Sequence, residues 1–129
     1  MTGLYGNGVA LTEKMLDFLW ARQNLTLNNI ANVDTPGFKS QYMTFEEEMA
    51  GRISAAKESR RPMMAVNQAI GSTRALLHTT RGESSRLDGN NVDMDQEQVE
   101  LVRTTYEYQY MTNSINNELN RLRSAAKSF

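Results

Sequence analysis

The sequence contains no cysteine, one histidine and two prolines in 129 residues. Without cysteine, the chain has neither a disulfide framework nor a thiolate metal site. A single histidine removes the side chain that zinc, haem and triad chemistries use most often. These absences disfavour most enzyme classes, so we expect no catalytic residue, no metal site and no cofactor.

An excess charge of one sign and a long apolar run are also missing. Fourteen Lys and Arg against fifteen Asp and Glu leave a net charge of -1, which provides no basic surface for nucleic acid or anionic lipid. No stretch approaches the ~18 apolar residues of a membrane span. A cleavable secretory signal is not recognisable either. We therefore expect no nucleic-acid partner, no small-molecule substrate and no membrane-spanning segment.

Apolar residues are concentrated at the two ends of the chain. Leu, Ile, Val and Phe fill 18 of the 74 positions in residues 1–38 and 94–129, but 8 of the 55 positions in residues 39–93. The middle part also carries turn signals such as Asp88-Gly89 and Pro62. The sequence therefore predicts three parts: an N-terminal helix with its terminating turn over 1–38, an extended or irregular middle over 39–93, and a C-terminal helix over 94–129.

Both ends carry apolar residues at intervals of seven, which is typical of a coiled-coil seam. The first seam consists of Leu4, Leu11, Phe18 and Leu25, and the second of Leu101, Tyr108, Ile115, Leu122 and Phe129. We expect helices over about 8–33 and 94–127, the second capped by Asp93 with Gln96 three residues later. The predicted fold is all-α, with two long terminal helices packed as an antiparallel coiled coil and joined by a long, mostly irregular segment.

Several apolar residues lie outside these seams, and one partner helix cannot cover them. They include Leu19, Trp20, Leu27, Val99, Val102, Tyr106 and Tyr110. Since the middle part offers no comparable third helix, packing between chains is favoured over a monomeric bundle. Two asparagine stripes, Asn24/Asn28/Asn32 and Asn113/Asn116/Asn117/Asn120, are interpreted as contact surfaces in preference to solvated polar faces, because burying an amide costs less than burying a charge. Tyr108 is assigned to the core, and Tyr106 and Tyr110 to interfaces.

Three patterns that suggest chemistry are weak. The acidic run from Asp88 to Asp95 lacks the glycine and glutamate positions of a calcium loop, so a turn and helix cap explain it better. Adjacent carboxylates at Glu46–Glu48 do not face each other on a helix. His78 has no triad partner identifiable by spacing. A small hydrolase using these residues stays a distant alternative.

The most specific stretch follows the first helix. Pro36 excludes Thr35 from the helical region and ends the helix before it. Gly37 can then take a positive φ at the third position of a type II turn from Thr35 to Phe38.

This stretch resembles the N-terminal signature of the bacterial flagellar rod, hook and hook-associated axial proteins. The matching residues are Ala31, Asn32, Thr35, Pro36, Gly37 and Phe38. A second stretch, which directly precedes a tyrosine-bearing helix, is similar to the proximal-rod members of that family. Its residues are Leu87, Asp88, Gly89, Asn90, Val92 and Asp93. The short chain agrees with this, since distal-rod and hook members carry large β domains between similar ends.

The resemblance implies a structural subunit without catalysis, exported unfolded by the flagellar type III apparatus and polymerised in the periplasm. It would help connect the MS ring to the distal rod and transmit torque. The implied partners are other copies of the chain, rod proteins of the FlgC, FlgF and FlgG type, the MS ring with its rod adapter FliE, and the export apparatus. A non-flagellar coiled-coil adaptor or scaffold is the alternative from another functional class. Such an adaptor, when purified on its own, should form an oligomer of defined size.

Overall fold

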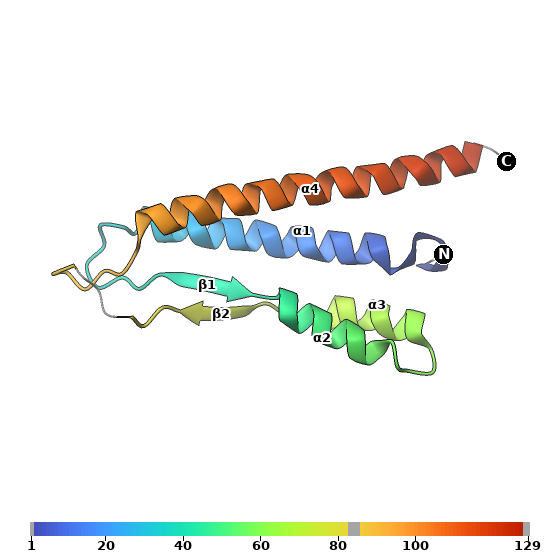
Figure 1. Ribbon diagram of the computed structural model, residues 1–129, viewed down its shortest axis with the longest axis horizontal. Coiled ribbons are helices and arrows are strands. Elements are labelled where there is room, and N and C mark those ends of the chain that lie inside the picture. The colour runs from blue at the N-terminus through green and yellow to red at the C-terminus, as the bar shows by residue number, and fades with distance from the viewer. Residues whose placement is uncertain (1, 83–85, 128–129) are drawn as a thin grey trace.

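A computed structural model describes residues 2–82 and 86–127, with the backbone alone for residues 2–6. Within these residues, four helices and two short strands follow one another (Figure 1). They are α1 (Thr2–Ala31), β1 (Gln41–Thr44), α2 (Glu46–Ala56), α3 (Pro62–Ser72), β2 (Leu76–Thr79) and α4 (Met94–Lys127). None of the described helices combines the length and the apolar character needed to cross a membrane.

The two long helices lie side by side and run in opposite directions (Figure 1). Gln23 on α1 donates to the Thr105 hydroxyl on α4 over 3.3 Å. Asn29, further along α1, donates to the Glu97 carboxylate nearer the start of α4. The sequence-based prediction of a helical fold built on two antiparallel terminal helices is confirmed.

The observed ends of α4 coincide with the predicted 94–127, and Asp93 is its cap. The Asp93 carboxylate accepts hydrogen bonds from the N–H groups of Asp95 and Gln96 at 3.1 and 3.3 Å. Helix α1 starts at Thr2, earlier than the expected position 8, and ends at Ala31, two residues before the expected position 33. It ends earlier because residues 32–37 form consecutive turns and do not continue the helix.

The middle of the chain folds back along α1 and lies below it in the view of Figure 1, where α4 lies above. Strands β1 and β2 pair antiparallel, with Gln41 opposite Thr79 and Thr44 opposite Leu76. Helices α2 and α3 continue from this ribbon as a helical hairpin. Local chemistry favours both helix starts, since α2 begins with three glutamates and α3 with Pro62. The hydrophobic pattern alone does not reveal these four short elements.

The main core lies between α1 and the middle segment. Its buried side chains are Phe18, Leu19, Phe45, Met49, Val66 and Ile70. The rings of Phe18 and Phe45 are 4.7 Å apart between centroids. Tyr108 and Met111 of α4 pack against this core and remain partly exposed. Part of the apolar surface that the sequence assigned to other chains, Leu19 above all, is therefore covered within the subunit.

The contact between α1 and α4 is less apolar than the heptad pattern suggests. Thr104 is the buried residue of α4 within the part that the structure describes. Thr26 and Asn29 are the buried polar residues of α1. Small side chains such as threonine let two helix backbones approach closely. Tyr108, which the sequence assigned to the core, is half-buried and packs against the edge of the main core.

Candidate functional site

The turn after α1 has the geometry that its sequence predicts. Gly37 has a φ of +73°. The N–H of Phe38 donates to the carbonyl of Thr35 over 3.2 Å and closes the turn around Pro36 and Gly37. Asn32 stabilises the backbone that leads into this turn. Its amide nitrogen donates to the Asn28 carbonyl, and its amide oxygen accepts from the Thr35 hydroxyl. The type II turn is confirmed, and Ala31 is the last helical residue before it.

The second sequence motif packs directly on this turn. The N–H of Gly37 donates to the Asp88 carbonyl over 2.7 Å, and the N–H of Asn91 donates to the Phe38 carbonyl over 3.2 Å. Gly89 has a φ of +78°, and a Cβ at this position would lie 3.7 Å from the Cα of Gly37. The backbones of the two motifs are thus in contact at Gly37 and Gly89. We call residues 31–40 together with residues 86–93 the junction.

Asn90 is the central side chain of the junction and is completely buried. Its amide nitrogen donates to the carbonyls of Asn32 and Thr35, each over 2.8 Å. Its amide oxygen accepts from the N–H of Val92 over 2.8 Å. One asparagine therefore connects the turn after α1 to the segment before α4, as a second donor to carbonyls that already accept the N–H groups of Thr35 and Phe38.

Asn91 extends the junction to the strands. Its amide oxygen accepts from the N–H of Ser40 over 2.7 Å, and its amide nitrogen donates to the Thr80 carbonyl over 2.9 Å. The N–H of Thr80 in turn donates to the Ser40 carbonyl. The side chain of Lys39 donates to the Gly89 carbonyl. Both connections between the long helices and the β ribbon therefore leave from one hydrogen-bonded cluster.

Asn29 joins α1, β1 and α4 at one point and is 1% exposed. Its amide oxygen accepts from the N–H of Gln41, and its amide nitrogen donates to the Gln41 carbonyl over 2.7 Å. The same nitrogen donates to the Glu97 carboxylate over 3.1 Å. Burial raises the pKa of Glu97, the Asn29 hydrogen bond opposes the rise, and the charges of Glu100 and Asp93 add to it.

Arg22 fixes the start of α2 against α1. Its guanidinium binds both carboxylate oxygens of Glu46, at 2.6 and 2.9 Å, and also donates to the Met43 carbonyl. The same group lies over the Phe45 ring, 4.1 Å from its centroid. Burial acts to raise the pKa of Glu46, but the hydrogen bonds and charge of Arg22, with backbone N–H groups, leave that pKa below its ordinary value.

The residues that were candidates for a hydrolase site take part in contacts that stabilise the fold. Glu46 belongs to the ion pair with Arg22, and Glu48 pairs with Arg52 one helical turn away. The ring of His78 stacks on Tyr42, with centroids 4.8 Å apart, and His78 Nε2 forms a hydrogen bond with the Thr44 hydroxyl. These groups belong to separate contacts of the ribbon and of α2.

Comparison with known proteins identifies the family. The sequence profile of a family described as "Flagella basal body rod protein" matches residues 20–39, which contain the last turns of α1 and the turn at Gly37. The flagellar basal body rod protein FlgB of Cereibacter sphaeroides is 34% identical over 132 residues, covering 97% of this chain and 92% of that protein. The chain belongs to the FlgB family.

Two further FlgB proteins support the assignment over nearly the whole length. The protein of Borrelia hermsii is 33% identical over 119 residues, covering 85% of this chain and 88% of its own length. The protein of Bacillus subtilis is 27% identical over 124 residues, covering 94% of each chain. The chain is thus a structural component of the flagellar basal body rod.

The structure places the predicted seam residues of this FlgB-family chain as follows. Phe18 is buried in the main core, and Leu11 is half-buried beside it. Leu25 is half-buried and lines a polar groove between β1 and α4. The half-buried seam residues of α4 are Leu101, Tyr108, Ile115 and Leu122. The side chain of Leu4 and the whole of Phe129 lie outside the described residues. The role of the seam in assembly stays a prediction.

Sequence reasoning missed three residues that organise the subunit: Arg22, Asn29 and Thr104. Asn29 adjoins the predicted asparagine stripe, yet the stripe members Asn24 and Asn28 are exposed, whereas Asn29 is buried. No local signal separates them, because the partner of Asn29 is a backbone segment 12 residues away. Thr104 is a small polar residue, and the hydrophobic pattern of α4 marks only the apolar residues of that helix.

Proposed function

We propose that this FlgB-family chain is a non-catalytic subunit of the proximal rod that polymerises in the periplasm through the outer faces of α1 and α4. Export by the flagellar type III apparatus, without a cleaved signal, would bring it there. Its neighbours would be further copies, rod proteins of the FlgC, FlgF and FlgG type, and the MS ring with FliE. In this position it helps connect the MS ring to the distal rod and transmit torque.

The observation that supports polymerisation is an exposed, largely apolar face on α4. Its apolar members Val99, Val102, Tyr106 and Tyr110 are all more than half exposed. At helical spacing the same line continues through exposed asparagines. These are Asn113, Asn117 and Asn120. A long helix face of exposed apolar, tyrosine and asparagine side chains, with Arg103 at its edge, is typical of a protein interface and not of a solvated surface.

Helix α1 presents a smaller surface of the same kind. Trp20 and Leu27 are 57% and 45% exposed, and Asn24 lies exposed between them. Tryptophan is enriched among residues that dominate binding energy, so its exposure in a single subunit favours a role in contact with a neighbour. We propose that the two faces together form the lateral surface of the subunit, and that residues 1–38 and 94–129 serve as its assembly parts.

In this proposal the junction has a positioning role. Its hydrogen bonds fix where α1 ends and α4 begins, and therefore set the relative register of the two outer faces. The proposed junction residues are Ala31, Asn32, Thr35, Pro36, Gly37, Phe38, Asp88, Gly89, Asn90, Val92 and Asp93. A shift between the helices would separate the exposed face of α4 from that of α1.

Incorporation into purified basal bodies tests the proposal. Val102→Asp and Tyr106→Asp place a carboxylate on the α4 face without altering a buried residue, so we expect at least tenfold less chain in basal bodies. The matched control is Gln98→Asp, which adds the same charge at an exposed position on the flank of the same helix. Normal incorporation of both face variants would show that the rod does not use this surface.

A further inference from the structure

One residue of the second sequence motif has no function inside the subunit. Asp88, Asn90, Val92 and Asp93 each accept or donate a hydrogen bond in the junction or in the helix cap. Leu87, which precedes them, is instead fully exposed. An isolated exposed leucine is common on protein surfaces, but this one directly precedes Asp88, whose carbonyl accepts a hydrogen bond from the N–H of Gly37.

Leu87 occupies one extremity of an elongated molecule. The segment from residue 86 to residue 90 reaches the far end of the long axis, whereas the start of α1, the end of α4 and the turn between α2 and α3 lie at the other end (Figure 1). The side chains around the Leu87 end are mainly acidic. The acidic ones are Asp34, Asp88, Asp93 and Asp95, and the basic ones are Lys39, bound to the Gly89 carbonyl, and Arg86, which bridges Asp34 and Asp88 at 3.9 and 3.4 Å.

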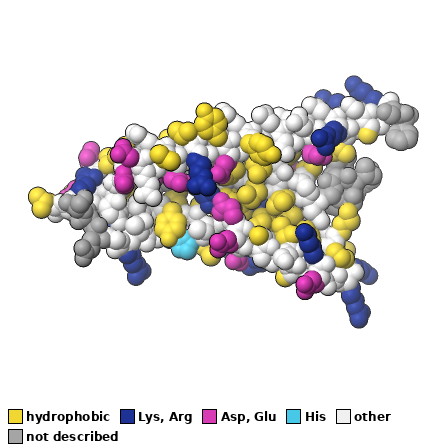
Figure 2. Space-filling view, in the orientation of Figure 1, with side chains coloured by type: hydrophobic (Ala, Val, Ile, Leu, Met, Phe, Trp, Pro, Cys, Tyr) yellow, Lys and Arg dark blue, Asp and Glu magenta, His cyan; other side chains and the backbone are white. Residues whose placement is uncertain are grey.

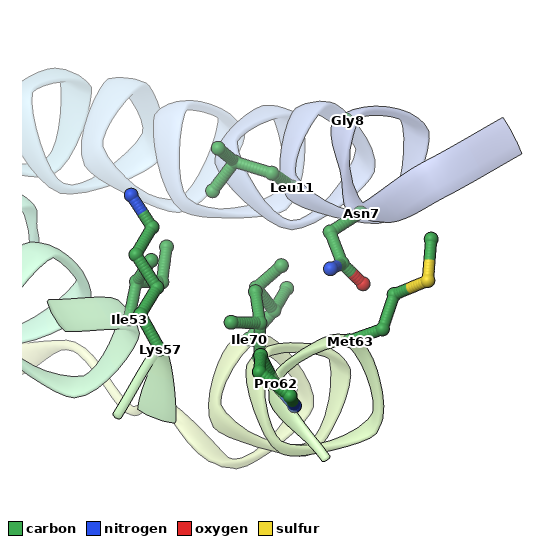
Figure 3. Close-up of a pocket in the computed structure, with 9 residues that line it drawn as sticks. Asn7, Gly8, Leu11, Ile53, Lys57, Pro62, Met63 and Ile70 are labelled. Atoms are coloured by element: carbon green, nitrogen blue, oxygen red, sulfur yellow. The ribbon is translucent and has the colours of Figure 1, made fainter. Parts of the chain in front are cut away.

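An apolar groove of about 430 Å³ lies at the opposite end, between α1 and the hairpin of α2 and α3. Leu11 projects into it from α1, and Ile53, Pro62 and Ile70 project from the other side, with Met63 at the mouth (Figure 3). Val66 completes the apolar lining. The groove is open to solvent, although its walls resemble a core.

The side chains around this groove are mainly basic. Lys57 lines the groove itself. The turn before α3, which leads to Pro62 of the groove, adds the exposed Arg60 and Arg61 and the acidic Glu58. Figure 2 shows Lys and Arg gathered at this end and a group of Asp and Glu at the other. The subunit is therefore electrostatically polarised along its length, although its net charge is only -1.

We propose that the groove receives Leu87 of a second copy of this chain, in a head-to-tail contact. This inference rests on the proposed function and adds one specific contact to it. The acidic end of one copy then faces the basic end of the next, and the leucine loses its exposure to water in a preformed apolar site. Because the two contacting surfaces differ, the contact is heterologous and leaves a free leucine and a free groove for further growth.

Cysteine crosslinking in cells tests the contact, and the cysteine-free chain has no reactive thiol of its own. A strain whose only copy carries Leu87→Cys and Met63→Cys is treated with a short bismaleimide, and its basal bodies are analysed on denaturing gels. We expect the chain to shift to dimers and larger species. Co-expressed single variants, Leu87→Cys with Met63→Cys, should yield dimers and nothing larger, because each copy has one reactive site.

The matched control replaces Leu87→Cys by Leu77→Cys, an exposed apolar residue on β2 that is remote from the proposed contact. This pair should leave the chain monomeric on the gel. Monomeric Leu87→Cys/Met63→Cys chain in normally assembled basal bodies would overturn the head-to-tail contact alone. Absence of the wild-type chain from basal bodies would instead overturn the proposed function.

A substitution gives a second readout that does not depend on crosslinking. Because Leu87 is fully exposed, Leu87→Glu should leave the unfolding midpoint of the purified chain unchanged while reducing incorporation into basal bodies at least tenfold. Leu87→Ile should restore it. Unchanged incorporation of Leu87→Glu would overturn the proposal.

Discussion

Asn90 and Thr35 are 55 positions apart in the chain, yet the Asn90 amide donates to the Thr35 carbonyl over 2.8 Å. The same amide nitrogen also binds the Asn32 carbonyl. The two motifs that are recognisable in the sequence as separate stretches thus form one hydrogen-bonded unit. Substitutions at either motif should therefore have similar consequences, for a shared physical reason.

Asn90→Ala should lower the free energy of unfolding by about 2–3 kcal/mol, because the hydrogen bonds of the buried Asn90 amide to Asn32, Thr35 and Val92 are lost. Asn90→Asp should be at least as damaging, since it sets a carboxylate oxygen against the carbonyls of Asn32 and Thr35. Chemical denaturation of the full chain measures both changes. Asn24→Ala is the control, because Asn24 is exposed on α1 and its loss should change the stability by less than about 0.5 kcal/mol.

Substitutions in the turn should impair motility in the order Pro36→Ala, Gly37→Asn, Gly37→Val, from mildest to most severe. A Cβ at Gly37 meets no atom within 4 Å, so its cost is conformational, about 1–2 kcal/mol for a positive φ. Asparagine tolerates that conformation better than valine, and Pro36→Ala only relaxes a preset angle. Swimming in soft agar at matched protein levels gives the ranking. A fully motile Gly37→Val strain would contradict the role of the turn.

Asn29→Leu should destabilise the chain by about 2–3 kcal/mol, because Gln41 loses the partners of both its N–H and its C=O. Faster hydrogen exchange at the Gln41 amide would localise the effect to β1. The neighbouring variant Asn28→Leu changes an exposed side chain in the same helix and should leave that amide protected. Equal protection in both variants would show that Asn29 does not hold the strand.

Two glutamates should respond to pH with opposite signs. The pKa of Glu97 is raised in the folded chain, so its ionised form opposes folding above that pKa, and the cost is relieved as pH falls through it. The pKa of Glu46 is lowered, so its stabilising contribution is present above the ordinary pKa and is lost as pH falls through the lowered value.

Glu97→Gln should therefore raise the free energy of unfolding near neutral pH, and Glu46→Gln should lower it. Each effect should stay below about 1 kcal/mol, because both carboxylates are partly exposed to solvent. The Glu97 difference from wild type should shrink as pH falls toward the ordinary glutamate pKa of about 4.3, and the Glu46 difference should shrink only as pH falls further. Urea denaturation at several pH values checks this, and effects of equal sign would contradict the assigned environments.

The features that the sequence predicts correctly have local causes. Asp93 caps α4 with its own side chain. Pro36 and Gly37 determine the turn through the φ angles that these two residues favour. Neither needs knowledge of distant residues. The two long helices are predictable for a similar reason, because a heptad pattern repeats over several turns.

The features that escape prediction depend on distant partners. Helix α2 is oriented by Phe45, which is buried only because Phe18 and Arg22 lie where the chain folds back. Asn29 differs from Asn28 only in which segment passes beside it. The junction was recognisable as two motifs, but their contact requires residues 39–85 to return to their starting point, and no pattern within that stretch specifies this.

The junction also makes the intervening chain a closed side loop. Because Gly37 binds Asp88 and Phe38 binds Asn91, the entrance and exit of this loop are held together independently of its contents. Doubling the length of such a loop raises its closure entropy by only about 0.6 kcal/mol. Extra residues inserted at the exposed turn between α2 and α3 would therefore leave α1 and α4 in register. The outer part of the subunit can change in size while the parts proposed for assembly keep their geometry.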